Sequence, residues 1–142
     1  MNAYLDSSVI LRKLLDEKDP VKDWNRWGKG ATSELALIES LRALDRLRLQ
    51  GDIQDGEVSE KRKALLEIFE LISVISLDRE ILDRAAEPFP TILATLDAIH
   101  LASALLYRAE RKSDLAFLTH DLQLGTAAQA MGFEVHGVRL SQ

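Results

Sequence analysis

The sequence has 142 residues, 46% of them hydrophobic and 29% charged, which is the composition of an ordinary globular domain. It contains no cysteine, which excludes disulfides, thiolate metal sites and cysteine nucleophiles. No signal-peptide pattern is visible, and no apolar run approaches the roughly 18 residues that span a bilayer, so we expect a cytoplasmic protein. The formal net charge of −5 disfavours bulk electrostatic binding of nucleic acid but still allows local basic patches.

Short apolar runs alternate with amphipathic helical patterns along the first half of the chain. In order, the predicted elements are a strand at 2–5, helices at 7–15 and 21–27, a strand at 31–33, and helices at 34–49 and 57–71. Asp6, Ser7 or Ser8 is suited to cap the first helix, because a short polar side chain there can accept hydrogen bonds from free backbone N–H groups.

The second half of the chain continues the alternation. In order, its predicted elements are a strand at 73–77, a helix at 79–87 capped by Asp78, a helix at 93–111, a strand at 115–118, a helix at 122–131 ended by Gly132, and a strand at 134–138. Strands that alternate with helices predict one α/β domain over residues 1–142, with a mostly parallel sheet flanked by helices on both faces.

Two acids occupy the same place relative to their predicted strands. Asp6 and Asp121 each follow an apolar strand and precede a helix. An aspartate at such a position commonly caps the helix, which contributes roughly 1 kcal/mol. Ligands of open α/β sheets bind at the same edge, so both carboxylates are also candidate ligands. The two roles are compatible, and the pattern leaves both open.

Two further acids lie within predicted helices. Glu39 projects beside Arg42 and Arg46 on the helical wheel, so an exposed stripe of ion pairs is one interpretation. Asp97 lies at the edge of an apolar stripe, where a partly desolvated carboxylate needs a partner. A buried salt bridge with Arg108 is one possible partner, and a metal ion is another.

Carboxylates that converge on one point repel one another unless a cation lies between them. With no cysteine and three histidines, an all-oxygen site suits Mg²⁺ or Mn²⁺ better than Zn²⁺. Such an ion can lower the pKa of a bound water and stabilise charge on a phosphoryl oxygen. Converging acids in this chain would therefore indicate hydrolysis of a phosphodiester bond.

Four fragments of the chain resemble the PIN-domain ribonucleases of the VapC toxin type. They are YLDSS at 4–8, TSEL at 32–35 with IESLRAL at 38–44, LDAIHLA at 96–102, and LTHD at 118–121. They occur in the family's order and spacing across nearly the whole chain, and the LDAIHLA block is the most specific. The resemblance implies that the catalytic, metal-binding acids are Asp6, Glu39, Asp97 and Asp121.

The resemblance also carries expectations about activity and partners. It implies a parallel sheet between helices, a homodimer, and Mg²⁺- or Mn²⁺-dependent endonucleolytic cleavage of single-stranded or loop RNA. The toxin branch is held inactive by a cognate antitoxin, whose C-terminal segment covers the acidic pocket. Ser8 and Thr119 match the small hydroxyls that the family places beside the acids, as contacts to them or to substrate. His100 matches a common family position, although packing between helices is the plainer interpretation.

Contacts to RNA would have to come from local basic residues. The helical positions favour Arg42, Arg46 and Arg108, although clusters of this kind are ordinarily solvated helix faces paired with nearby acids.

Other functions remain open from the sequence. A dehalogenase-type phosphotransferase would need a second aspartate where the chain has Ser8, and a phospho-receiver would need a lysine after its last core strand. A housekeeping RNA-processing enzyme, a DNA nuclease of the same fold and an inactive PIN-like binding module are the remaining alternatives. The short chain favours the toxin branch.

Overall fold

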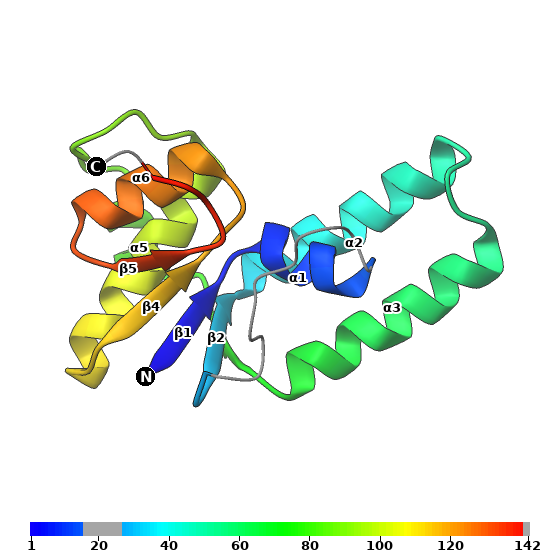
Figure 1. The fold of residues 1–142 in the computed structure, drawn as a ribbon, viewed down its shortest axis with the longest axis horizontal. Coiled ribbons are helices and arrows are strands. Elements are labelled where there is room, and N and C mark those ends of the chain that lie inside the picture. Colours follow the sequence, from blue (N-terminus) through cyan, green and yellow to red (C-terminus); the bar gives the residue numbers. More distant parts are fainter. Residues whose placement is uncertain (16–26, 141–142) are drawn as a thin grey trace.

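In the computed structural model, which describes residues 1–15 and 27–140, five strands form one sheet in the order β3-β2-β1-β4-β5 (Figure 1). They are β1 (Asn2–Leu5), β2 (Gly30–Ser33), β3 (Ser73–Ile75), β4 (Leu115–Leu118) and β5 (Glu134–His136). Each described pairing is parallel, and the central strand β1 pairs with β2 on one side and β4 on the other. All five strands therefore end at the same edge of the sheet.

Helices cover both faces of this sheet, as predicted. They are α1 (Ser7–Leu14), α2 (Glu34–Leu49), α3 (Asp55–Glu70), α4 (Arg79–Ala85), α5 (Thr95–Arg111) and α6 (Leu122–Ala130). Figure 1 shows α1, α2 and α3 on one side of the sheet and α5 and α6 on the other, with α2 and α3 extending away from the strands as a long pair. None of the described helices is long and apolar enough to cross a membrane.

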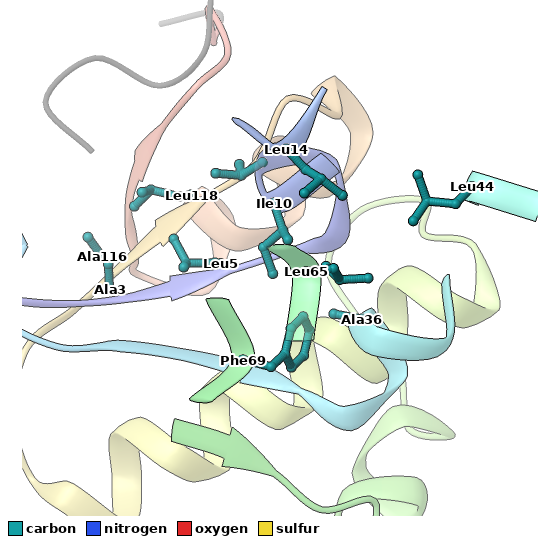
Figure 2. Close-up of a cluster of buried hydrophobic side chains, with 11 residues drawn as sticks. Ala3, Leu5, Ile10, Leu14, Ala36, Leu44, Leu65, Phe69, Ala116 and Leu118 are labelled. Carbon is teal, nitrogen blue, oxygen red and sulfur yellow. The ribbon is translucent and has the colours of Figure 1, made fainter. Parts of the chain in front are cut away.

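The alternation of side chains along the two central strands divides the core into two layers. Ala3 and Leu5 of β1 belong to the layer that packs against α1, α2 and α3, together with Ala116 and Leu118 of β4. Figure 2 shows this layer, in which Phe69 from α3 lies with the other labelled side chains. Successive residues of a strand point to opposite faces, so each layer receives every second residue.

The second layer lies between the sheet and helices α5 and α6. Tyr4 of β1 and Phe117 of β4 face this side, where they pack with Leu101 of α5 and Leu124 of α6. The Tyr4 and Phe117 rings are stacked, with centroids 5.1 Å apart and an angle of 20° between their planes. Tyr4 is therefore a fully buried phenol, and its hydroxyl requires a polar partner inside the core.

The predicted strands and helices of the described residues are all present, and the differences lie in their ends. The helix predicted at 93–111 begins at Thr95, because Ala94 is extended and acts as its N-cap. The strands predicted at 73–77 and 134–138 are shorter and end at Ile75 and His136. Gly132 follows α6 with φ 89°, a conformation that favours glycine, as its predicted stop position implies. The helix predicted at 21–27 lies outside the described residues except for its last position.

Candidate active site

The ends of β1 and β4 bring Asp6 next to Thr119. Leu5 pairs with Leu118 in the parallel ladder, and the Asp6 backbone N–H donates to the Leu118 carbonyl at 3.1 Å. The residues that follow these two strands therefore start from neighbouring positions at the carboxyl edge of the sheet. This edge is where open parallel sheets bind their ligands.

The Asp6 carboxylate accepts hydrogen bonds on both oxygens. Ser8 Oγ donates to Oδ1 at 2.5 Å, and Thr119 Oγ1 donates to Oδ2 at 2.7 Å. The Val9 backbone N–H also donates to Oδ1 at 3.3 Å, so Asp6 caps α1 as predicted. Burial nevertheless raises the pKa of Asp6 above its ordinary value, against the lowering effects of Ser8, His100 and Thr119.

The two hydroxyls link Asp6 to the turn before α6. Ser8 Oγ accepts from the backbone N–H of His120 at 2.9 Å, and Thr119 Oγ1 accepts from the backbone N–H of Asp121 at 3.0 Å. Asp121 in turn caps α6, since its Oδ1 accepts from the Leu124 backbone N–H at 2.9 Å. Asp6 is thus connected to Asp121 through Thr119 and to His120 through Ser8, and both aspartates are also helix caps.

Glu39 projects from α2 toward α5 and contacts His100. The Glu39 Oε1 to His100 Nε2 distance is 2.5 Å, and the other ring nitrogen, Nδ1, lies 2.7 Å from the Tyr4 hydroxyl. The Glu39 side chain is 23% exposed, whereas His100 is 1% exposed. An ion-pair stripe with Arg42 and Arg46 is therefore the wrong interpretation of Glu39, because a histidine on another helix is nearer to it.

Tyr4 and His100 extend this contact into the core. Burial, followed by the charges of Asp6 and Glu39, raises the pKa of the Tyr4 phenol well above its ordinary value, so the phenol keeps its proton and can donate to Nδ1. A histidine that accepts at Nδ1 carries its proton at Nε2, from which it donates to Glu39. His100 is therefore more than a packing residue.

Asp97 lies in the first turn of α5 and is half-buried. Burial and then the charges of Asp121, Asp6 and Glu39 raise its pKa to about 6, and His100 opposes the shift. Within the part of the chain that the structure describes, no donor hydrogen-bonds to the Asp97 carboxylate. The charges of the four predicted acids are thus coupled at Asp97, and we call Asp6, Glu39, Asp97 and Asp121 the acidic cluster.

Arg108 does not neutralise Asp97, so the alternative of a buried salt bridge between them is wrong. Arg108 lies in the last turn of α5, about 16 Å from Asp97 along the helix axis. Its Nη2 donates to the Met131 carbonyl at 3.1 Å, and its guanidinium lies 4.0 Å from the centre of the Phe133 ring. These contacts hold Arg108 against the end of α6.

The other predicted RNA contacts lie on α2. Arg42 and Arg46 are exposed and follow Glu39 along the helix. Arg42 forms a 3.2 Å ion pair with Asp45, which is the usual surface pairing. The structure thus brings the acids and hydroxyls to one edge of the sheet, leaves Arg42 and Arg46 on the α2 surface, and holds Arg108 at the far end of α5.

The donor chemistry of the acidic cluster fits a hard divalent cation, since carboxylate oxygens are the ligands that Mg²⁺ and Mn²⁺ prefer. Across residues 1–15 and 27–140, however, no three histidine, aspartate or glutamate side chains form a group that could hold a metal ion as they stand. Burial, and after it the charges of Asp121, Asp6 and Glu39, raise the pKa of Asp97, so the ionised forms of these carboxylates disfavour one another.

Tyr4 is the site residue that sequence reasoning missed. The signal was available, because Tyr4 stands between two small or aliphatic residues of a buried strand and so faces the opposite helix layer. A buried tyrosine hydroxyl needs a partner, and a histidine on the facing helix could supply one. The two-residue period of the strand predicts which face of the sheet the Tyr4 side chain points to. It does not predict which residue of the facing helix lies next to the Tyr4 hydroxyl.

Comparison with known proteins agrees with this architecture. The model of the PIN domain family matches residues 3–128. The chain belongs to the PIN-domain family. Ribonuclease VapC47 of Mycobacterium tuberculosis is 30% identical over 138 residues, which cover 92% of each chain. Ribonuclease VapC46 of the same species is 33% identical over 138 residues, which cover 93% of this chain and 94% of that relative.

A solved structure is also similar in fold. The toxin-antitoxin complex from Klebsiella pneumoniae contains a chain that superposes with a TM-score of 0.66, covering 91% of this chain and 94% of that one, at 15% sequence identity. At this identity the likeness concerns the fold. The α/β PIN fold predicted from the four fragments is therefore confirmed by both the family model and the arrangement of helices and strands.

Proposed function

We propose that this protein is a Mg²⁺- or Mn²⁺-dependent endoribonuclease whose metal is held by the acidic cluster. The observation that carries the proposal is the half-buried Asp97 carboxylate, which has no hydrogen-bond donor among the described residues. Burial, and after it the charges of the other three acids, raise its pKa. A cation among these carboxylates would turn their repulsion into attraction. The names of the two Mycobacterium tuberculosis relatives, both ribonucleases, support RNA as the substrate.

The four residues of the acidic cluster would contribute differently to binding the ion. Asp6 and Asp121 each have an oxygen fixed by a helix N-terminus, so they define the position of the site. Glu39 and Asp97 approach from α2 and α5 and would complete it. When bound, the ion would supply an acidified water and stabilise charge on the phosphate. Ser8 and Thr119 keep Asp6 oriented through their hydroxyls.

The regulatory part of the proposal rests on the family resemblance. As a VapC-type toxin of a type II pair, the protein would act as a homodimer and bind a cognate antitoxin over the acidic cluster. Exposed apolar side chains lie beside three of the acids in sequence, namely Ile38, Leu96 and Leu122. Such residues could contact an antitoxin segment without entering the metal site.

The proposal can be tested with purified protein and total RNA. We expect cleavage with Mg²⁺ or Mn²⁺, none with a chelator, and a loss on the order of 100-fold or more for Asp97→Asn, because even outer partners of metal ligands are commonly worth 10- to 100-fold. Asp78→Asn is the matched control. Asp78 is likewise an aspartate near the start of a helix, where it accepts from the Ile81 backbone N–H at 2.9 Å, but it stands outside the acidic cluster.

Two outcomes would overturn the proposal. Equal cleavage with Mg²⁺, with chelator and by Asp97→Asn would show that the acidic cluster does no chemistry. Absence of cleavage under every condition by a folded wild-type protein would favour the inactive PIN-like binding module instead.

A further inference from the structure

Three residues from three elements form a continuous hydrogen-bonded chain behind the acidic cluster. Tyr4 lies in β1, His100 in α5 and Glu39 in α2. The Tyr4 hydroxyl lies 2.7 Å from His100 Nδ1, and His100 Nε2 lies 2.5 Å from Glu39 Oε1. Tyr4 and His100 are 0% and 1% exposed, so solvent does not compete for these hydrogen bonds. Neither residue belongs to the acidic cluster.

The Tyr4 end of this hydrogen-bonded chain is held by the central strands of the sheet. The Tyr4 ring is stacked on Phe117 and meets the His100 ring edge-on, with centroids 5.9 Å apart and an angle of 74° between the planes. Both Tyr4 and Phe117 belong to central strands of the sheet. The imidazole is thus fixed by ring contacts and by the phenol before it reaches Glu39.

Glu39 is the member of this hydrogen-bonded chain whose side chain most needs to be held in place. Its side chain has three rotatable bonds, is partly exposed, and extends from a helix rather than from a strand end. Oε1 is occupied by His100, whereas Oε2 has no donor in the described part of the chain. The arrangement therefore leaves one Glu39 oxygen available while the other is anchored.

We propose that Tyr4 and His100 are positioning residues that hold the Glu39 carboxylate in the orientation in which Oε2 can bind the divalent cation. This inference rests on the proposed function, because it assigns a role toward the same metal site. An apolar side chain in place of His100 could fill the space beside Tyr4, but it could not donate a hydrogen bond to Glu39. The contribution should therefore appear in metal affinity, apart from any effect on folding.

The test measures Mn²⁺ binding to the full chain by isothermal titration calorimetry, without RNA, alongside thermal unfolding of each variant. His100→Leu should weaken Mn²⁺ binding by about 10- to 100-fold, the usual cost of losing the partner that orients a metal ligand. His100→Gln should recover much of this loss, because its amide nitrogen can donate to Glu39 from near the position of Nε2. Tyr4→Phe should cause a smaller, several-fold loss.

Phe117→Leu is the matched control. It removes the ring stacked on Tyr4 and loosens the same core layer, yet it leaves each hydrogen bond of the chain in place. We expect it to lower the melting temperature while retaining nearly wild-type Mn²⁺ affinity. If Tyr4 and His100 position Glu39, Mn²⁺ affinity should depend on whether a hydrogen-bond donor to Glu39 is present. If they act only in packing, the loss of Mn²⁺ affinity should parallel the loss of melting temperature.

The outcomes separate this inference from the proposed function. Wild-type Mn²⁺ affinity in a folded His100→Leu protein, or affinity losses that follow the melting temperatures, would overturn the positioning role while leaving the nuclease proposal standing. If His100→Leu does not fold, the comparison of Tyr4→Phe with Phe117→Leu decides in the same way. A wild-type protein that binds no Mn²⁺ would overturn the proposed function and this inference together.

Discussion

The two halves of the acidic cluster are built differently. Asp6 and Asp121 stand at strand ends, where each accepts a hydrogen bond from the first turn of the helix that follows, and the hydroxyls of Ser8 and Thr119 donate to Asp6. Glu39 and Asp97 stand on helices; Glu39 is held by His100, and Asp97 has no hydrogen-bond donor among the described residues. The strand-end half is therefore organised by the fold itself, while the helical half carries the unrelieved repulsion that a cation would remove.

The largest effect on stability is expected from breaking the strand-end half. Thr119→Val keeps the shape of a fully buried side chain but removes the hydroxyl that joins Asp6 Oδ2 to the Asp121 backbone N–H. Leaving these groups unsatisfied should cost about 1 to 3 kcal/mol of unfolding free energy. Chemical denaturation of the metal-free protein measures this loss.

Thr126→Val is the control for that substitution. Thr126 is exposed on α6 and donates to the Leu122 carbonyl of its own helix, so its loss should change stability by less than about 0.5 kcal/mol. If both substitutions lower the unfolding free energy equally, the hydroxyl bridge from Thr119 to Asp6 contributes no more to stability than the exposed hydrogen bond of Thr126 does.

The helical half should make the stability of the metal-free protein depend on pH. The pKa of Asp97 is about 6 in the folded protein against an ordinary value of 3.8, so the folded state binds more protons between these values. The contribution of Asp97 to metal-free stability should therefore fall as the pH rises from about 4 to about 6. Asp97→Asn should raise the melting temperature by a few degrees at pH 7 and change it little at pH 4.

Differential scanning calorimetry of wild type and Asp97→Asn at both pH values tests this expectation. Mg²⁺ should reduce the difference at pH 7, because a bound cation relieves the same repulsion. A metal-free Asp97→Asn protein that is less stable than wild type at pH 7 would show that Asp97 has a stabilising partner and that the helical half carries no unrelieved repulsion.

The smallest effects are expected from the arginines. Arg108→Ala should cost about 1 kcal/mol, because it removes a partly buried cation–π contact with Phe133, and should change cleavage per folded molecule little. Arg46→Ala should leave stability unchanged and weaken RNA cleavage a few-fold at low salt, since Arg46 is exposed on the same helix as Glu39.

Arg48→Ala is the control for Arg46→Ala, because Arg48 lies in the same last turn of α2 but is paired with Asp45 at 2.8 Å. Measuring both the cleavage rate and the melting temperature of each variant separates a contribution to RNA cleavage from a contribution to stability. A strong loss of cleavage in a stable Arg108→Ala protein would favour the prediction that Arg108 contacts RNA.

Much of the fold could be predicted because it depends on local signals. Period-2 and period-3.6 patterns located the strands and helices, and short polar residues after strands located the caps at Asp6, Asp78 and Asp121. Element ends were less predictable. The start of α5 at Thr95 depends on the extended conformation of Ala94, for which the helical pattern at 93–111 contained no signal.

Pairings between elements were harder to predict than the elements themselves. The helical wheel placed Glu39 beside Arg42, but the wheel describes neighbours within one helix and says nothing about α5. The same limit produced the proposed salt bridge between Asp97 and Arg108, which share a helix but lie at its opposite ends. Glu39 instead contacts His100 of α5, and Arg108 contacts Met131 and Phe133 beyond α6.

The sequence by itself determined which residue types could do chemistry and which edge of the sheet would carry them. Parallel strands that end in acids must deliver those acids to one edge, whatever the details of packing. The tertiary structure alone decided how each acid is held. A carboxylate's partner depends on which side chains from other elements come within about 3 Å, and that distance is set by the packing of α2 and α5 against the sheet.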